Sequence, residues 1–190
     1  MTYDTISYVV EDRVAHITLD RPDMKNAVNS TMSRELPAVW QQFESDDAAV
    51  VAIVTGAGGK FFCTGADLTD LPHTDGEGRE GSLESIAWTS LQNEVWKPVI
   101  CAVNGMAIGG GLHFVADSDI VIASQTATFF DTHVKLGLVA GLEPVSLARK
   151  MPMEAVLRMM LVGGKERMSA ARAYELGMVG EVGADDQLLN

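Results

Sequence analysis

Cysteine, basic leaders and long apolar runs are scarce or missing in this sequence. Its 190 residues include two cysteines, Cys63 and Cys101, without the spacing of a disulfide framework or a C-x-x-C motif, which favours reduced thiols. No apolar run is long enough to span a membrane, and the N-terminus has neither the basic start nor the apolar segment of a secretory signal. We therefore expect a cytoplasmic location.

Positive charge is also in short supply. The 14 lysines and arginines stand against 26 aspartates and glutamates, which gives a formal charge of −12 at pH 7. Nonspecific binding to nucleic acids or to anionic membranes needs a net or clustered positive field. We therefore expect neither a nucleic acid nor a membrane as a partner.

Several motifs that mark well-known enzyme classes are missing as well. The sequence has no G-x-S-x-G elbow, no Walker A loop and no H-E-x-x-H pair. Residues 76–81 formally match the dinucleotide fingerprint, but no strand is predicted before them and their neighbours are charged, so a phosphate cradle is rejected. His113, Asp131 and His133 lack a recognisable ligand spacing, and we expect no metal.

Length and patterning predict a single α/β domain over residues 1–190. The expected strands lie at 6–10, 14–19, 50–55, 99–103 and 119–123, and the expected helices at about 30–44, 82–96, 112–116, 144–162 and 169–176. Asn29 or Ser30 should cap the first helix, Ser82 the second, and Pro37 should kink or split the first. Residues 71–81 are expected to form a mobile polar loop, and about 144–190 a helical end.

The stretch from Lys97 to Ala123 is the most informative part of the chain. Val99 to Val103 is an apolar, β-branched run that fits a strand buried on both faces, and Asn104 and Gly105 end it. Gly109 to Gly111 then precede a helix, so backbone amides without intrahelical partners are expected there. Glycines let a ligand come close, and the helix dipole favours negative charge at this point.

A second loop completes this pattern. The strand at 50–55 leads to a glycine-containing loop that ends in Gly65, Ala66 and Asp67. Each loop could offer one amide, and two converging amides form an oxyanion hole, in which each donor contributes about 2.7–4 kcal/mol. Such a hole suits a thioester that turns into an enolate.

Three segments are carriers of a family resemblance: LDRPDMKNAVN (Leu19 to Asn29), FFCTGADL (Phe61 to Leu68) and NGMAIGGGLHFVADSDIVIA (Asn104 to Ala123). In order and spacing they resemble the crotonase superfamily, also called the enoyl-CoA hydratase/isomerase family. The resemblance implies a crotonase-like spiral of ββα units, with the C-terminal helical segment missing or shortened in this chain. It also implies a homotrimer or a hexamer.

The same resemblance implies a substrate and its binding residues. The substrate would be an acyl-CoA thioester whose enolate is held by the amides of Ala66 and Gly110, and no cofactor is expected beyond the coenzyme A that the substrate carries. The residues implied in coenzyme A binding are Lys25, Ala27, Ala66, Asp67 and Leu68.

Coenzyme A is polyanionic, so an acidic protein needs local cations to bind it. Arg21, Lys25 and Lys60 are the candidates near the implied site. Ordinary solvated surface charge is the alternative for each of them.

Hydratases of this family are known for two glutamates that activate water, and this sequence has His113 and His133 at the matching positions. A helix N-terminus disfavours positive charge, so His113 is expected to be neutral, while His133, close to Asp131, is expected to be the more basic. Glu143 is a further candidate that could orient His133. The alternatives are a packed core histidine, a surface-loop histidine and a simple helix-start acid.

The predicted function is that of an acyl-CoA lyase of the enoyl-CoA hydratase/isomerase family with histidines in place of glutamates. Two alternatives stay open. The histidine-rich arrangement is similar to that of the family's β-diketone hydrolases, the 6-oxocamphor hydrolase type, which cleave a carbon–carbon bond with water. The loss of both glutamates also fits a non-catalytic acyl-CoA binding subunit.

Overall fold

The computed structural model describes residues 2–71 and 86–188, within which ten strands form two sheets. The larger sheet has the strand order β1-β2-β3-β5-β7-β10, and the smaller one has the order β4-β6-β8-β9. The strands are β1 (Ile6–Glu11), β2 (Val14–Leu19), β3 (Val51–Gly56), β4 (Phe61–Cys63), β5 (Val99–Val103), β6 (Met106–Ile108), β7 (Ile120–Ser124), β8 (Thr128–Phe130), β9 (Met168–Ser169) and β10 (Glu181–Gly183).

Five α-helices and five short 3₁₀ turns accompany the sheets in the described ranges. The helices are α1 (Ser30–Ser45), α3 (Leu112–Asp117), α4 (Glu143–Leu147), α5 (Met153–Val162) and α6 (Ala170–Glu175). The turns are η1 (Pro22–Met24), η2 (Leu91–Asn93), η3 (Gly109–Gly111), η4 (His133–Leu136) and η5 (Gly163–Lys165). None of these helices is both long and apolar enough to cross a bilayer.

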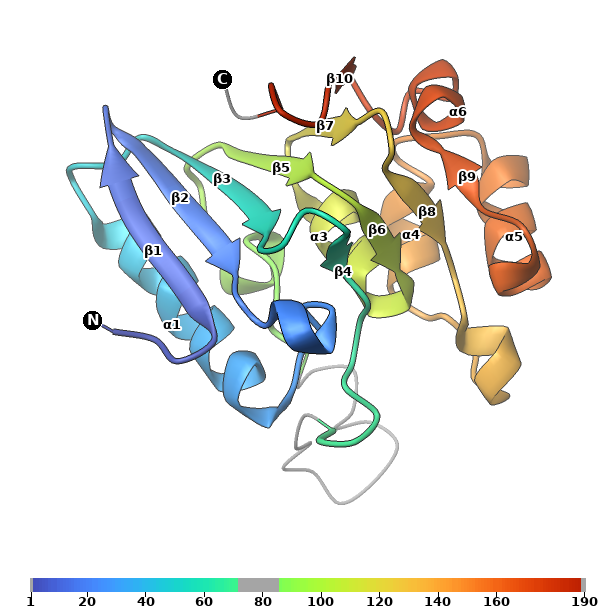
Figure 1. Cartoon of the computed structure of the whole chain (residues 1–190), viewed down its shortest axis with the longest axis horizontal. Coiled ribbons are helices and arrows are strands. Elements are labelled where there is room, and N and C mark those ends of the chain that lie inside the picture. Colours follow the sequence, from blue (N-terminus) through green and yellow to red (C-terminus); the bar gives the residue numbers. More distant parts are fainter. Residues whose placement is uncertain (1, 72–85, 189–190) are drawn as a thin grey trace.

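From β3 to β8, successive strands alternate between the two sheets. β3, β5 and β7 are parallel neighbours in the larger sheet, and β4, β6 and β8, which follow them in the chain, are parallel neighbours in the smaller one. β5–β6–α3 and β7–β8–α4 are therefore two turns of a ββα spiral, which confirms the predicted fold class. Figure 1 shows β1 and α5 at opposite ends of the molecule, with β4, β6 and α3 between them.

Burial explains why the central segments form their elements. In β2 every second residue, Ala15, Ile17 and Leu19, is fully buried, as expected for a strand with one face on the core. β5 lies between β3 and β7, and its buried residues point to both faces, which fits the continuous apolar run of its sequence.

Helix α1 begins where it was predicted but is not interrupted. Asn29 is the N-cap, and its side chain accepts a hydrogen bond of 3.0 Å from the Met32 amide. The predicted split at Pro37 is wrong, because α1 runs unbroken from Ser30 to Ser45. An interior proline costs about 3 kcal/mol, whereas each fully buried large apolar side chain contributes about 1.5–3 kcal/mol. Five such side chains line the buried face of α1: Met32, Leu36, Val39, Trp40 and Phe43.

The helix predicted over residues 82–96 is wrong in its described part. Residues 86–96 form an irregular segment that contains only η2. Trp88 fixes this segment against α1, since its carbonyl accepts from Trp40 Nε1 at 2.7 Å and its own Nε1 donates to Ser33 Oγ at 3.0 Å. Glu94, with φ 55°, then ends the turn. The predicted cap at Ser82 and the polar loop, apart from Leu71, lie outside the described residues.

Helices α4, α5 and α6 confirm the helical patterns near the C-terminus, but this part is not helical throughout. β9 pairs antiparallel with β8, and β10 pairs parallel with β7. The segment therefore adds one strand to each sheet as well as helices, which its short apolar runs did not reveal.

Candidate active site

Two loops meet backbone to backbone beside the start of α3. One carries Gly65 and Ala66 after β4, and the other is the triple glycine after β6. A Cβ atom on Gly65 would lie 2.7 Å from the Gly110 nitrogen, and one on Gly110 would lie 3.6 Å from the Ala66 nitrogen. Gly65 also has φ +80°, which side chains disfavour. The fold thus brings together the two residues whose amides were predicted to converge.

Neither of these amides has an acceptor in the described part of the chain. The bridge between residues 28 and 66 uses the amides of Val28 and Asp67, so the Ala66 amide points to the other side. Gly110 lies in the first turn of η3, where amides have no intrahelical acceptor. No hydrogen bond between described residues has either amide as its donor.

Both residues border a pocket of about 160 Å³. Its lining residues are Ala66, Ile86, Trp88, Gly110, His113, His133, Val139, Gly141, Leu142 and Glu143. Sequence reasoning missed Trp88, because no local pattern marks it. Its ring packs edge-on against His113 with centroids 5.9 Å apart, and a Cβ on Gly110 would lie 2.9 Å from its Cζ3 atom.

His113 is held in the pocket wall by a carboxylate. The triple glycine forms η3 and leads directly into α3, as predicted, which places His113 in the first turn of that helix. Its Nε2 atom lies 3.2 Å from Glu143 Oε1 at the start of α4, and both side chains are buried. Glu143 was expected beside His133, but its closer contact is with His113.

His133 reaches the same carboxylate from η4 and is anchored from behind by Asp131. The His133 amide donates to Asp131 Oδ1 at 2.9 Å, and Nδ1 lies 2.6 Å from Oδ2. The other ring nitrogen, Nε2, is 3.7 Å from Glu143 Oε1, which is too long for a direct hydrogen bond. The sequence marked Asp131 only as a nearby acid. Its position two residues before a loop histidine is the signal that could have assigned it a contact.

These contacts shift two pKa values in opposite directions. The hydrogen bond to Asp131 raises the pKa of His133 and, with the charges of Glu143 and Asp131, outweighs the effect of partial burial. Burial acts to raise the pKa of Glu143, but the hydrogen bond and charge of His113, a backbone hydrogen bond and the charge of His133 lower it overall. The contacts therefore favour an ionised Glu143 beside a protonated His133.

The residues predicted for coenzyme A binding lie next to the pocket, and among them only Ala66 belongs to its lining. Ala27 is buried, whereas Lys25 and Leu68 are exposed. The bridge between Val28 and Ala66 places the loop that carries Lys25 alongside the loop that carries Leu68. The exposed residues Lys25 and Leu68 thus lie on adjacent loops outside the pocket wall.

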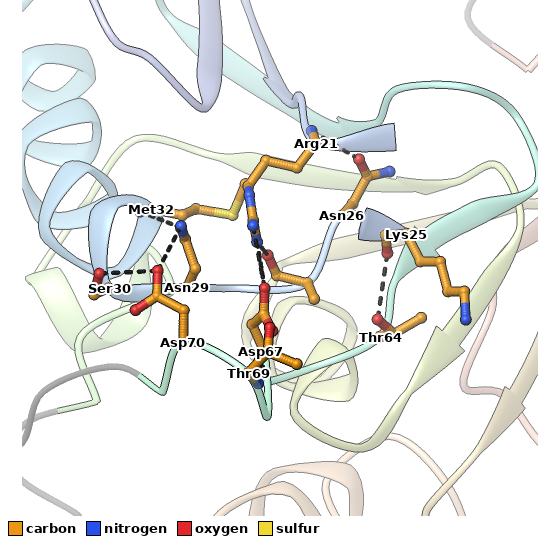
Figure 2. Close-up of polar contacts among 11 residues, drawn as sticks. Arg21, Lys25, Asn26, Asn29, Ser30, Met32, Thr64, Asp67, Thr69 and Asp70 are labelled. Carbon is orange, nitrogen blue, oxygen red and sulfur yellow. Dashed lines mark hydrogen bonds and ion pairs between the residues drawn. The ribbon is translucent and has the colours of Figure 1, made fainter. Parts of the chain in front are cut away.

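The three candidate cations differ in their surroundings. Both terminal nitrogens of Arg21 lie 3.1 Å from Asp67 Oδ2, and this buried carboxylate also binds Thr69. Figure 2 shows Arg21 directed at Asp67 and the Lys25 side chain directed away from that pair. Arg21 and Asp67 therefore brace the loops against each other, whereas Lys25 remains at the surface.

Lys25 and Lys60 flank one aromatic ring. The Nζ atom of each lies 5.7 Å from the centroid of Phe61, and both lysines are exposed. Phe61 begins β4, the strand that leads to Ala66. Two lysines that form no ion pair with a described residue thus lie near the loop that carries the Ala66 amide.

The described residues contain no group of three or more His, Cys, Asp or Glu side chains arranged to hold a metal ion. The pocket's two imidazoles are instead each within reach of the single Glu143 carboxylate. The chemistry that this arrangement supports is proton transfer next to a backbone site for negative charge.

Comparisons with known proteins identify the family of this chain. Residues 10–190 match the family model described as enoyl-CoA hydratase/isomerase. The chain is 35% identical to the (E)-benzylidenesuccinyl-CoA hydratase of Thauera aromatica, in an alignment that covers 93% of this chain and 69% of that protein. It is 34% identical to the short-chain-enoyl-CoA hydratase of Clostridium acetobutylicum, in an alignment that covers 95% of this chain and 69% of that protein. A crystal structure of an enoyl-CoA hydratase/isomerase from Mycobacterium paratuberculosis is 45% identical, with a TM-score of 0.87 over 98% of this chain and 71% of that one. The chain therefore belongs to the enoyl-CoA hydratase/isomerase family, the crotonase superfamily.

Proposed function

We propose that this protein binds an acyl-CoA thioester and stabilises its enolate with the amides of Ala66 and Gly110. The observation that carries the proposal is the meeting of the two loops beside one pocket, where neither amide has an acceptor among the described residues. An oxyanion held by two such donors gains about 2.7–4 kcal/mol from each in measured cases.

The reaction that fits best is the addition of water to an α,β-unsaturated acyl-CoA, or the reverse elimination. Relatives named as hydratases and dehydratases support this class. Water would be held between His133 and Glu143, whose facing atoms are 3.7 Å apart at the pocket, with His113 fixing the carboxylate from the other side. His133 and Glu143 would then do the acid–base work that two glutamates perform in the family's known hydratases.

Coenzyme A would lie along the surface that carries Lys25, Leu68 and Lys60. The paired lysines at Phe61 supply the local positive charge that a polyanionic ligand needs on a protein of net charge −12. Ala27 and Asp67 contribute through the position of their backbone, because the Asp67 side chain is bound to Arg21.

The direct test is the loss of conjugated-thioester absorbance when the protein is mixed with crotonyl-CoA. We expect loss of absorbance with the wild type, none with His133→Ala, and none with Gly110→Pro, which deletes one amide donor. Full activity of Gly110→Pro would show the oxyanion-hole assignment to be wrong.

A second reaction, hydrolysis of a carbon–carbon bond between two carbonyl groups, is favoured by one specific feature. Two imidazoles approach a single buried carboxylate, which suits activation of water for attack on a carbonyl, with the leaving enolate held by the two amides. Acetoacetyl-CoA distinguishes this reaction: carbon–carbon cleavage yields acetate and acetyl-CoA, whereas thioester hydrolysis releases free coenzyme A thiol.

A non-catalytic acyl-CoA binding role is the outcome if neither substrate is turned over while acyl-CoA still raises the melting temperature. The homotrimer or hexamer implied by the family also stays a prediction. Light scattering on the purified protein would test it, with a monomer as the contrary result.

A further inference from the structure

Asp131 is a fully buried carboxylate whose side-chain hydrogen bonds within the described part of the chain all involve His133. It follows β8 directly, and in the described part of the chain both of its oxygens are engaged by His133, one by the amide and one by the ring. No lysine or arginine of the described residues forms an ion pair with it. Because a carboxylate removed from water is costly unless a positive charge offsets it, the ring of His133 is the group that can supply that charge.

The same contact fixes which ring atom faces the pocket. A carboxylate only accepts hydrogen bonds, so Nδ1 carries a hydrogen, and Nε2 is left to face Glu143. Gly109 lies beside the ring, since a Cβ atom built on it would lie 3.3 Å from Thr132 Oγ1 and 4.0 Å from His133 Cε1. The first glycine of the triple thus lies near His133, and the second is the one whose amide borders the pocket.

We propose that Asp131 is the positioning residue of this site. It holds His133 protonated with Nε2–H toward the pocket, so that His133 is the proton donor of the reaction and Glu143 is the proton acceptor. The inference rests on the proposed acyl-CoA function and assigns the roles within it.

The assignment gives a balanced sequence in the hydration direction. Glu143 takes a proton from water as the water oxygen bonds to the β-carbon of the unsaturated thioester. The electron pair of the carbon–carbon double bond moves to the thioester oxygen, which is held by the Ala66 and Gly110 amides. His133 Nε2–H then protonates the α-carbon and restores the carbonyl. Transfer of the proton from Glu143 Oε1 back to Nε2, which is 3.7 Å away, resets the site.

The charges around His133 support this state. Asp131, before η4, and Glu143, on α4, are the charged groups that act on the ring, and His113, on α3, lies behind Glu143. Asp131 and Glu143 together raise the pKa of His133, and the hydrogen bond to Asp131 contributes most. Both carboxylates therefore favour the protonated ring, which is the proton donor.

The test follows the ¹⁵N resonances of the His133 imidazole across pH in the wild type, in Asp131→Asn and in Asp46→Asn. Asp46 is a matched control, since its carboxylate also accepts a side-chain and a backbone hydrogen bond but lies outside the pocket. We expect both His133 nitrogens to be protonated at neutral pH in the wild type and in Asp46→Asn, and the titration midpoint to fall in Asp131→Asn. With an accepted acyl-CoA, kcat should fall about 10²-fold in Asp131→Asn, with its alkaline limb moved to lower pH and KM little changed.

A wild-type His133 that titrates like a free imidazole would overturn the positioning role, and this measurement needs no variant to fold. An unchanged midpoint in folded Asp131→Asn would overturn it too. If the wild type turns over an acyl-CoA but its His133 titration midpoint is not raised, only the positioning role is refuted. If the midpoint is raised but no acyl-CoA is turned over, the proposed function is refuted, and the pairing of Asp131 with His133 is structural.

Discussion

The pocket and the C-terminal region of α5, β9 and α6 contain the same kinds of features in different surroundings. In the pocket, Glu143 lies 3.2 Å from His113, and both side chains are at most 5% exposed. In the C-terminal region, Glu166 lies 2.6 Å from Arg158, and both are at least half exposed. The C-terminal region also has the larger hollow, about 360 Å³ against about 160 Å³.

Each region also has a glycine with a left-handed backbone. Gly65 has φ +80°, and a Cβ there would lie 2.7 Å from the Gly110 nitrogen, whereas Gly177 has φ +85° and a Cβ there would meet only the Lys150 carbonyl at 3.4 Å. The shorter ion pair and the larger hollow both lie in the C-terminal region, so neither feature distinguishes the candidate site. The candidate site is distinguished by the burial of its charges and by the close approach of two backbones. Burial matters because a charge out of water interacts strongly with its neighbours and a solvated one does not.

The largest expected effect on activity comes from comparing the variant Glu143→Gln in the pocket with the variant Glu166→Gln in the C-terminal region. Glu143→Gln keeps the shape of the side chain but removes the proton acceptor and the charge that His113 and His133 share, so kcat should fall by about 10²–10⁴-fold. Glu166→Gln removes a solvated charge and should leave both kcat and the melting temperature unchanged. Equal activity of the two variants, measured with whichever acyl-CoA the wild type accepts, would refute a catalytic role for the buried carboxylate.

A comparison of Gly65→Ala with Gly177→Ala separates crowding of the Gly110 amide from backbone strain. Both substitutions put a side chain on a left-handed residue, but only the methyl group at Gly65 would press on the Gly110 amide. We expect kcat to fall by about 10²–10³-fold in Gly65→Ala, the loss measured for one missing oxyanion donor, and to stay near the wild-type value in Gly177→Ala. Similar losses in both would mean that strain, and not access to the amide, limits the reaction.

Sequence patterns predicted the backbone half of the site better than the side-chain half. The glycines at 65 and 109–111 lack side chains, which indicates that another backbone or a ligand can approach them closely. The buried runs at 50–55 and 99–103 predict strands before these glycines. The meeting of the two loops was therefore expected from local signals. The hairpin and α1 were predictable for the same reason, because period and capping are local properties, whereas the ββα spiral was expected from the family resemblance.

The side-chain contacts were not predictable in this way. Trp88 reaches the pocket only because Trp40 and Ser33 hold it, and those partners are 48 and 55 residues away. The preference of Glu143 for His113 over His133 depends on where α3 and α4 pack, which no spacing encodes. Tertiary hydrogen bonds likewise overrode the helix predicted through residues 86–96.

Substitution of Lys25 or Lys60 should have a smaller effect, which falls on substrate binding rather than on the chemical step. Lys25→Ala and Lys60→Ala each remove one of the two charges beside Phe61, so KM for an acyl-CoA should rise a few-fold with kcat unchanged, and the rise should shrink at high salt. Lys165→Ala, an exposed lysine of η5 in the C-terminal region, is the control. If Lys165→Ala raises KM as much as the other two, the effect reflects net charge and not a coenzyme A surface.

The smallest expected effect is the dependence of stability on pH. The pKa of His133 is raised in the folded protein above its usual value of 6.5, so the stability that His133 contributes is fully present below pH 6.5 and is lost as the pH rises through its folded pKa. The pKa of Glu143 is lowered from 4.5, so its contribution is present above pH 4.5 and is lost in more acidic solution. Melting temperatures of the wild type and His133→Gln should therefore differ most near pH 6 and converge toward pH 9. A difference that grows with pH instead would mean that the folded protein holds His133 as the neutral base, and would reverse the roles of the two pocket groups.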